Sequence, residues 1–137
     1  MSLRKLLIVD DNESYPPISD QHADLVETRD SIRGPNAIEW SDYAVVFSHT
    51  RNDAADWADE RFEEGVIDGL FVFSGGEDTV SEYLGVYTVP RPLFERRFDA
   101  FLKRYVEGQS IEECTKVFLS DSFDEPTSPS AGEEKFS

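Results

Sequence analysis

A short apolar run that recurs along the chain and each time ends in polar residues constrains the fold most. "LLIVD" spans residues 6–10, and similar runs follow at Tyr43–Ser48 and Gly69–Ser74, with a less apolar copy at Gly85–Val89. Continuous apolar runs of this length are typical of strands covered on both faces, as in the parallel sheets of α/β proteins. Each run therefore predicts one buried parallel strand.

Helical patterns follow the second and the fourth run. Residues 52–65 and 91–108 both carry apolar side chains at spacings of three and four and end in glycine, which predicts two amphipathic helices. A further short helix is predicted within residues 110–121. Residues 16–34 allow two interpretations, a helix or a loop that carries a short strand at Asp24–Thr28, and we favour the helix.

Strands that alternate with helices predict an α/β fold, a doubly wound parallel sheet of four or five strands. In such sheets functional groups gather outside the carboxyl ends of the strands. The polar residues that end the apolar runs should therefore meet at one edge of the sheet. They are Asp10, Asp11, Ser48, His49 and Ser74.

The length and composition favour one domain with a flexible extension. A chain of 137 residues suits a single core, and we assign residues 1–119 to this α/β domain. Residues 120–137 are polar and acidic, which predicts a flexible tail. The single cysteine, Cys114, cannot form an internal disulfide, and a zinc site built on cysteines is excluded.

The net charge and the hydropathy of the sequence restrict where the protein is located and which partners it binds. The net charge of -16 would repel the phosphate backbone of DNA or RNA, so we expect no nucleic-acid partner. The sequence contains no run of the roughly 20 apolar residues that cross a bilayer, and no signal-peptide pattern. We therefore expect a cytoplasmic protein without membrane contact.

The order of these pieces, over residues 4–107, resembles the receiver domain of two-component response regulators. The matching motifs are "VDDNE" after the first strand, "FVFSGG" with Ser74 after the third run, and "VPRPLF", where Arg91 takes the place of the family's lysine. The resemblance implies a flavodoxin-like topology. It also implies that Asp10 and Asp11 would hold magnesium, while a hydroxyl and a cation would hold the oxygens of a phosphoryl group on a third carboxylate.

That third carboxylate is missing. The acceptor position holds Ser48 or His49, and Asp53 follows four or five residues later. A guanidinium at position 91 should pair with both oxygens of Asp10 or Asp11. The chain therefore resembles a degenerate receiver without phosphotransfer, a signalling or assembly module that acts by binding a protein. We expect no enzyme activity and no cofactor, with a magnesium ion at Asp10 and Asp11 as the alternative.

A basic strip on the predicted helix over 91–108 is the candidate partner-binding surface, either for another protein or for a homodimer. A solvated helix face is the alternative interpretation. The strip consists of Arg96, Arg97, Lys103 and Arg104.

An enzyme remains the competing interpretation. The haloacid-dehalogenase phosphohydrolases resemble this chain in having acidic residues after the first strand. A magnesium-dependent phosphohydrolase would use Asp10 as nucleophile, with Asn12, Ser74 and Arg91 as supports. Its later acid cluster would have to come from Asp121 and Asp124.

Overall fold

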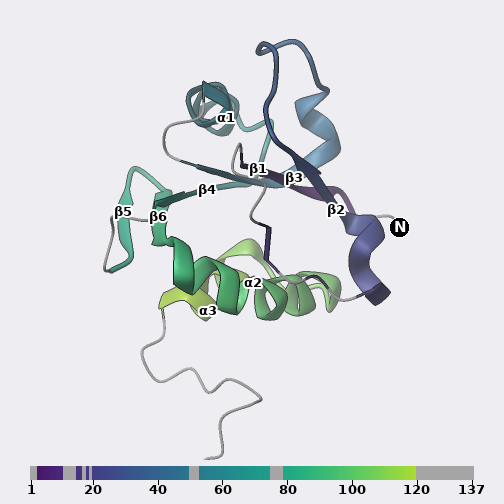
Figure 1. Ribbon diagram of the computed structural model, residues 1–137, viewed down its shortest axis with the longest axis vertical. Coiled ribbons are helices and arrows are strands. Elements are labelled where there is room, and N and C mark those ends of the chain that lie inside the picture. Colours follow the sequence, from purple (N-terminus) through teal and green to yellow (C-terminus); the bar gives the residue numbers. More distant parts are fainter. Residues whose placement is uncertain are drawn as a thin grey trace, which may run out of the picture.

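A six-stranded sheet separates two layers of helices in the computed structural model, which describes residues 3–10, 15–16, 18, 20–49, 53–74 and 79–119 (Figure 1). The strands are β1 (Lys5–Val9), β2 (Val26–Arg29), β3 (Tyr43–His49), β4 (Gly69–Ser74), β5 (Ser81–Tyr83) and β6 (Val86–Pro90). The four apolar runs of the sequence are β1, β3, β4 and β6, so all four predicted strands are present; β1, β3 and β4 are largely buried, whereas the first three residues of β6 are only half-buried.

The helices are α1 (Asp53–Glu63), α2 (Arg91–Val106), α3 (Ile111–Leu119) and the 3-10 turns η1 (Asp20–Leu25) and η2 (Trp40–Asp42). All three predicted α-helices are present, and α1 and α2 are followed by glycines of positive φ, 81° at Gly65 and 89° at Gly108. Within the described residues, none of these helices is long and apolar enough to cross a membrane.

The strands lie in the order β2-β1-β3-β4-β6-β5. Every neighbouring pair is parallel except β5 and β6, which are antiparallel. The fold is thus α/β with a mostly parallel sheet, as predicted. The sheet has six strands instead of four or five, because β2 and β5 extend it at its two sides.

The helix favoured for residues 16–34 is wrong. The segment forms η1 and then β2, which pairs with β1 from Leu6–Val26 to Val9–Arg29. Strand pairing prevails because β1 is buried and its backbone groups need partners on both sides, and the β-branched Val26 and Thr28 suit a strand. The alternative of a short strand in this segment is therefore the correct one.

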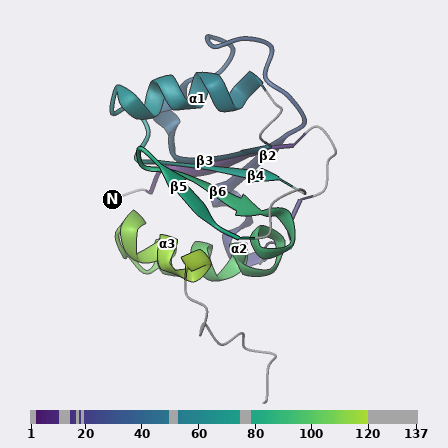
Figure 2. The same ribbon diagram turned by 90° about the vertical axis from the view of Figure 1, so that its left-hand side faces the viewer.

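The helices cover the sheet on both faces (Figure 2). On the face under α2 and α3, here called the α2 face, the Phe47 ring lies 5.1–5.4 Å, between ring centroids, from four other phenylalanine rings. These rings belong to Phe71, Phe94, Phe98 and Phe101. Aromatic pairs at these distances add to the burial of apolar area. The apolar stripe predicted for residues 91–108 is therefore confirmed as core.

The opposite face, the α1 face, has smaller side chains. Ala54 and Ala58 of α1 are fully buried against it, and Trp40 of η2 packs beside them. Successive residues of a strand point to opposite faces, so Leu7 and Val9 of β1 belong to the α1 face and its other apolar residues to the α2 face. This alternation decides which polar residues can meet at the end of the sheet.

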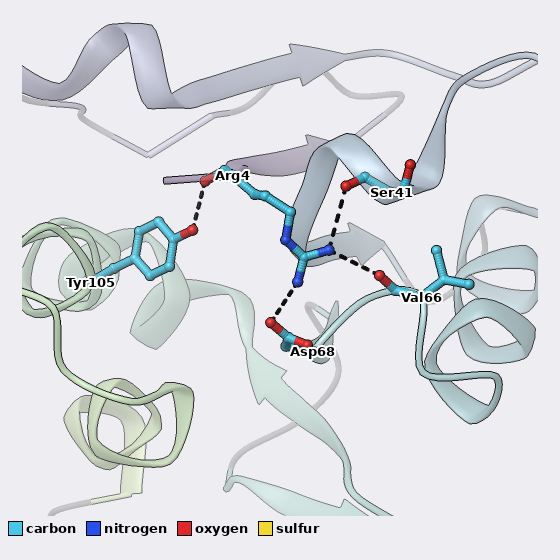
Figure 3. A network of polar contacts seen from close by, with 5 residues as sticks. All are labelled: Arg4, Ser41, Val66, Asp68 and Tyr105. Carbon is cyan, nitrogen blue, oxygen red and sulfur yellow. Dashed lines mark hydrogen bonds and ion pairs between the residues drawn. The ribbon is translucent and has the colours of Figure 1, made fainter. Parts of the chain in front are cut away.

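At the amino ends of the strands, Arg4 joins several segments (Figure 3). Its Nη1 donates to the carbonyl oxygens of Val66, at 3.0 Å, and Ser41, at 3.4 Å. Its Nη2 lies 2.6 Å from a carboxylate oxygen of Asp68. The Tyr105 hydroxyl of α2 donates to the Arg4 carbonyl oxygen at 2.6 Å. One residue thus connects the approaches to β1, β3 and β4 with the end of α2.

Candidate functional site

Asp10 and Arg91 meet at the carboxyl edge of the sheet, where the parallel strands end. Asp10 follows β1 and is fully buried, whereas Arg91 is the first residue of α2. The guanidinium binds both carboxylate oxygens, with Nη1 2.9 Å from Oδ2 and Nη2 3.2 Å from Oδ1. The predicted bidentate pairing of Arg91 is therefore confirmed, with Asp10 as its partner.

The position of this pair at the start of α2 has an electrostatic reason. A cation at the first residue of a helix is opposed by the helix dipole, which favours negative charge there. The Asp10 carboxylate supplies that negative charge, and Pro90 makes no side-chain cap. The hydrogen bonds to Asp10 raise the pKa of Arg91 above its ordinary value. The guanidinium and the carboxylate thus stabilise each other's charged form.

Phe73 lies beneath this pair. The guanidinium carbon of Arg91 is 4.9 Å from the centroid of the Phe73 ring, within cation–π distance. The His49 ring meets Phe73 edge-on at 5.8 Å, and the Phe94 ring stacks on it at 4.6 Å. The sequence alone did not single out Phe73. Its place as the penultimate residue of a predicted strand was the one available signal.

The residues expected to form a single pocket are divided between the two faces of the sheet. Asp10, His49 and Arg91 gather on the α2 face around Phe73. Ser48 is fully buried in alternation with Val46 on the α1 face, and its hydroxyl donates to the neighbouring carbonyl of His49 at 3.2 Å. Ser74 follows Val72 by two positions, which assigns it to the same α1 face. Ser48 and Ser74 therefore do not join the Asp10–Arg91 cluster.

The acidic residues do not form a metal site in the part of the chain that the structure describes. No group of three or more His, Cys, Asp or Glu side chains there is arranged to hold an ion. Asp53 begins α1 and is exposed, whereas Asp10 is buried and bound on both oxygens by Arg91. Asp11 and Asn12 lie outside the described residues, as do Asp121, Asp124 and the predicted tail over 120–137.

The basic strip of α2 has internal contacts. Arg97 donates to the carbonyl of Val117 at 3.0 Å, and Arg104 donates to that of Glu113 at 2.9 Å. The Val117 carbonyl lies in the last turn of α3, where a helix cannot satisfy its own acceptors. These two arginines therefore hold α3 on α2. Of the other two cations, Lys103 is exposed and lies 3.4 Å from Asp99, and Arg96 is exposed.

A hollow that the sequence did not predict lies on the α1 face between α1 and the β5–β6 hairpin. Its volume is about 310 Å³. It is lined by Ala55, Asp56, Asp59, Glu63, Leu70, Val72, Tyr83, Leu84, Val86 and Thr88. The only signal for the hairpin in the sequence was Gly85, at the second position of a two-residue loop.

Comparisons with protein-family models, with curated proteins and with solved structures find no match for this chain.

Proposed function

We propose that this protein is a receiver-like module that binds a protein partner independently of phosphorylation, in signalling or in assembly. The observation that carries the proposal is the bidentate ion pair between Asp10 and Arg91. A receiver needs this carboxylate to hold magnesium. In this protein both oxygens of Asp10 already accept hydrogen bonds from the Arg91 side chain.

The order of the strands supports a flavodoxin-like topology. Counting the parallel strands alone, the sheet reads second, first, third, fourth and fifth, which is the order of doubly wound folds of that type. The antiparallel β5 is an addition to this pattern. The Asp10–Arg91 pair lies at the carboxyl ends of the strands, where such folds hold their ligands.

The acceptor position also supports binding over phosphotransfer. The end of β3 carries Ser48, which faces the α1 face, and His49, which contacts Phe73. Neither side chain can form an acyl phosphate. A phosphohydrolase with Asp10 as nucleophile would require a free carboxylate oxygen in line with its substrate. The guanidinium of Arg91 occupies both oxygens.

Incubation of the full chain with magnesium and acetyl phosphate, followed by intact mass measurement, tests this proposal. We expect no added phosphoryl group. A parallel incubation with p-nitrophenyl phosphate should give no turnover. A phosphoprotein, or turnover that is lost in Asp10→Asn, would overturn the proposal. Arg91→Lys, which replaces the bidentate guanidinium with a single ammonium, should also give no phosphoprotein, because no carboxylate stands at the acceptor position.

A further inference from the structure

We propose that the hollow between α1 and the β5–β6 hairpin is the docking groove for an extended peptide segment that alternates cationic and apolar side chains. This inference rests on the proposed binding function and names the class of partner. The groove is defined by the residues that line the hollow of about 310 Å³.

The floor of the groove is apolar. Leu70 and Val72 of β4 and Val86 of β6 line it, and the half-buried Val72 and Val86 face it where α1 does not cover the sheet. Burying the apolar surface of such a floor is favourable because it removes that surface from water. A partner therefore gains most by placing aliphatic side chains there.

One wall of the groove is negatively charged. Asp56, Asp59 and Glu63 follow one another at spacings of three and four residues, so they share a face of α1. Among the described residues, none of the three forms an ion pair, whereas the neighbouring Glu60 and Glu64 both lie near Arg61. Side chains with positive charge complement this wall.

The spacing of the carboxylates favours a chain over a single ion. Glu63 follows Asp56 by seven positions in the helix, which corresponds to about 10 Å along the helix axis. One metal ion or one ammonium group cannot contact carboxylates spread over that length. In an extended peptide alternate side chains recur about every 7 Å, so two or three cationic residues match the wall while the intervening residues reach the floor and the hairpin.

The opposite wall exposes large apolar side chains. Tyr83 and Leu84 line the groove and are 77% and 75% exposed. The hairpin approaches the Phe62 ring of α1 closely, since a Cβ on Gly85 would lie 3.1 Å from that ring. Tyr83 and Leu84 therefore lose exposed apolar surface when a partner binds in the groove.

A substitution at the loop residue Leu84 should change peptide binding and folding stability in opposite directions. Leu84 has φ 52° and Gly85 has φ 89°, as in a type I′ turn, where asparagine is favoured at the first position and leucine is strained. Leu84→Asn should thus raise the melting temperature while it removes an apolar contact. If Leu84 served only folding, its replacement would not raise the melting temperature while weakening peptide binding.

The test is fluorescence anisotropy of a labelled peptide with the core arginine-leucine-arginine-leucine-arginine, added to the full chain at low salt. We expect binding that weakens about tenfold in the triple variant Asp56→Asn, Asp59→Asn, Glu63→Gln. Leu84→Asn should weaken it about threefold, with a higher melting temperature. A peptide with serine in place of leucine should bind more weakly to the unmodified chain.

The matched control is the triple variant Asp24→Asn, Asp42→Asn, Glu112→Gln, which changes the net charge equally at exposed positions away from the groove. Equal weakening in both triple variants would show attraction to the net charge alone and would overturn the proposal. The proposal would also be overturned if the peptide did not bind, or if the protein self-associated with the groove occupied by a second copy of the chain. If the peptide does not bind in the groove and no phosphoprotein forms, only the groove proposal is wrong. If a phosphoprotein forms, the proposed phosphorylation-independent function is wrong as well.

Discussion

The Asp10 carboxylate accepts a hydrogen bond on each oxygen from the guanidinium of Arg91, 81 positions later in the chain. The carboxylate is fully buried, and 17% of the Arg91 side chain is exposed. Because β3 and β4 lie between β1 and β6, this pair ties together the ends of strands that do not touch. Its loss should therefore affect the stability of the whole sheet.

Removing Arg91 should be strongly destabilising. Arg91→Met leaves the buried Asp10 charge without its main partner, and we expect the free energy of unfolding to fall by about 3 kcal/mol. Urea denaturation followed by circular dichroism measures this change. The control Arg96→Met, at an exposed position of the same helix, should cost no more than about 0.5 kcal/mol.

The double variant Asp10→Leu, Arg91→Met distinguishes a broken pair from lost packing. With both charges gone, most of the stability should return, because a buried ion pair can often be replaced by apolar residues. If the double variant is as unstable as Arg91→Met alone, the cost arises from the lost contact of the Arg91 guanidinium with the Phe73 ring, and the ion-pair argument is wrong.

Magnesium should not stabilise the protein. A ligand that binds only the folded state raises the melting temperature, but both oxygens of Asp10 are engaged by Arg91. Thermal unfolding in millimolar magnesium chloride should match that in sodium chloride of equal ionic strength. An increase that disappears in Asp10→Asn would contradict this prediction and would restore a metal site at the carboxyl edge.

The contacts of Arg4 should contribute to stability at the opposite end of the sheet. Arg4→Met removes the hydrogen bonds to Val66, Ser41 and Asp68, and we expect a loss of about 1–2 kcal/mol. Chemical denaturation measures it, with Lys5→Met as the control, since Lys5 is an exposed cation that lies 4.0 Å from Glu27. Equal losses in the two variants would mean that Arg4 contributes no more than an exposed cation.

Cys114 should make stability fall at alkaline pH. Burial raises the pKa of its thiol to about 11 from an ordinary value of 9.0. The folded state therefore holds this proton more tightly than the unfolded state, so the contribution is complete below about pH 9 and is lost as the pH rises toward 11. Between about pH 8 and pH 10 the unmodified chain should lose about 1 kcal/mol more than Cys114→Ala.

Urea denaturation of both proteins at the two pH values measures that difference. The raised pKa of Tyr43, about 12, acts in the same direction in both proteins and cancels in the comparison. Parallel loss of stability in the two proteins would show that the Cys114 thiol is not protected as its burial implies.

The sequence predicted the strands and helices well where one physical cause dominates. The apolar runs at Tyr43–Ser48 and Gly69–Ser74 are buried strands, and the phenylalanines after Arg91 form a buried helix face, because burial of apolar side chains dominates in each segment. The segment over 16–34 was mispredicted because its apolar residues fit a helix locally, while the free side of β1 imposed a strand. The spacing of apolar residues within a segment does not show that a neighbouring strand needs a pairing partner.

The candidate site was predictable only in part. Arg91 and Asp10 were placed by their motifs, but the faces of Ser48 and His49 were not predictable, because a run that is apolar on both faces carries no alternation to assign them. The contacts of Arg97 and Arg104 depend on how α3 packs on α2. The groove depends on a hairpin that leaves part of the sheet uncovered, which no local pattern reveals.

The outermost strands of the sheet bear on aggregation. The central strands are apolar enough to pair with other chains, and such pairing begins at unprotected strands. β2 is only four residues long and contains Glu27 and Arg29, which lie near Lys5 of β1. β5 has three residues, and all three are exposed. Short outer strands of this kind, with charged side chains on β2, offer little backbone for the outer strand of another molecule to pair with, although the interior of the sheet is strongly apolar.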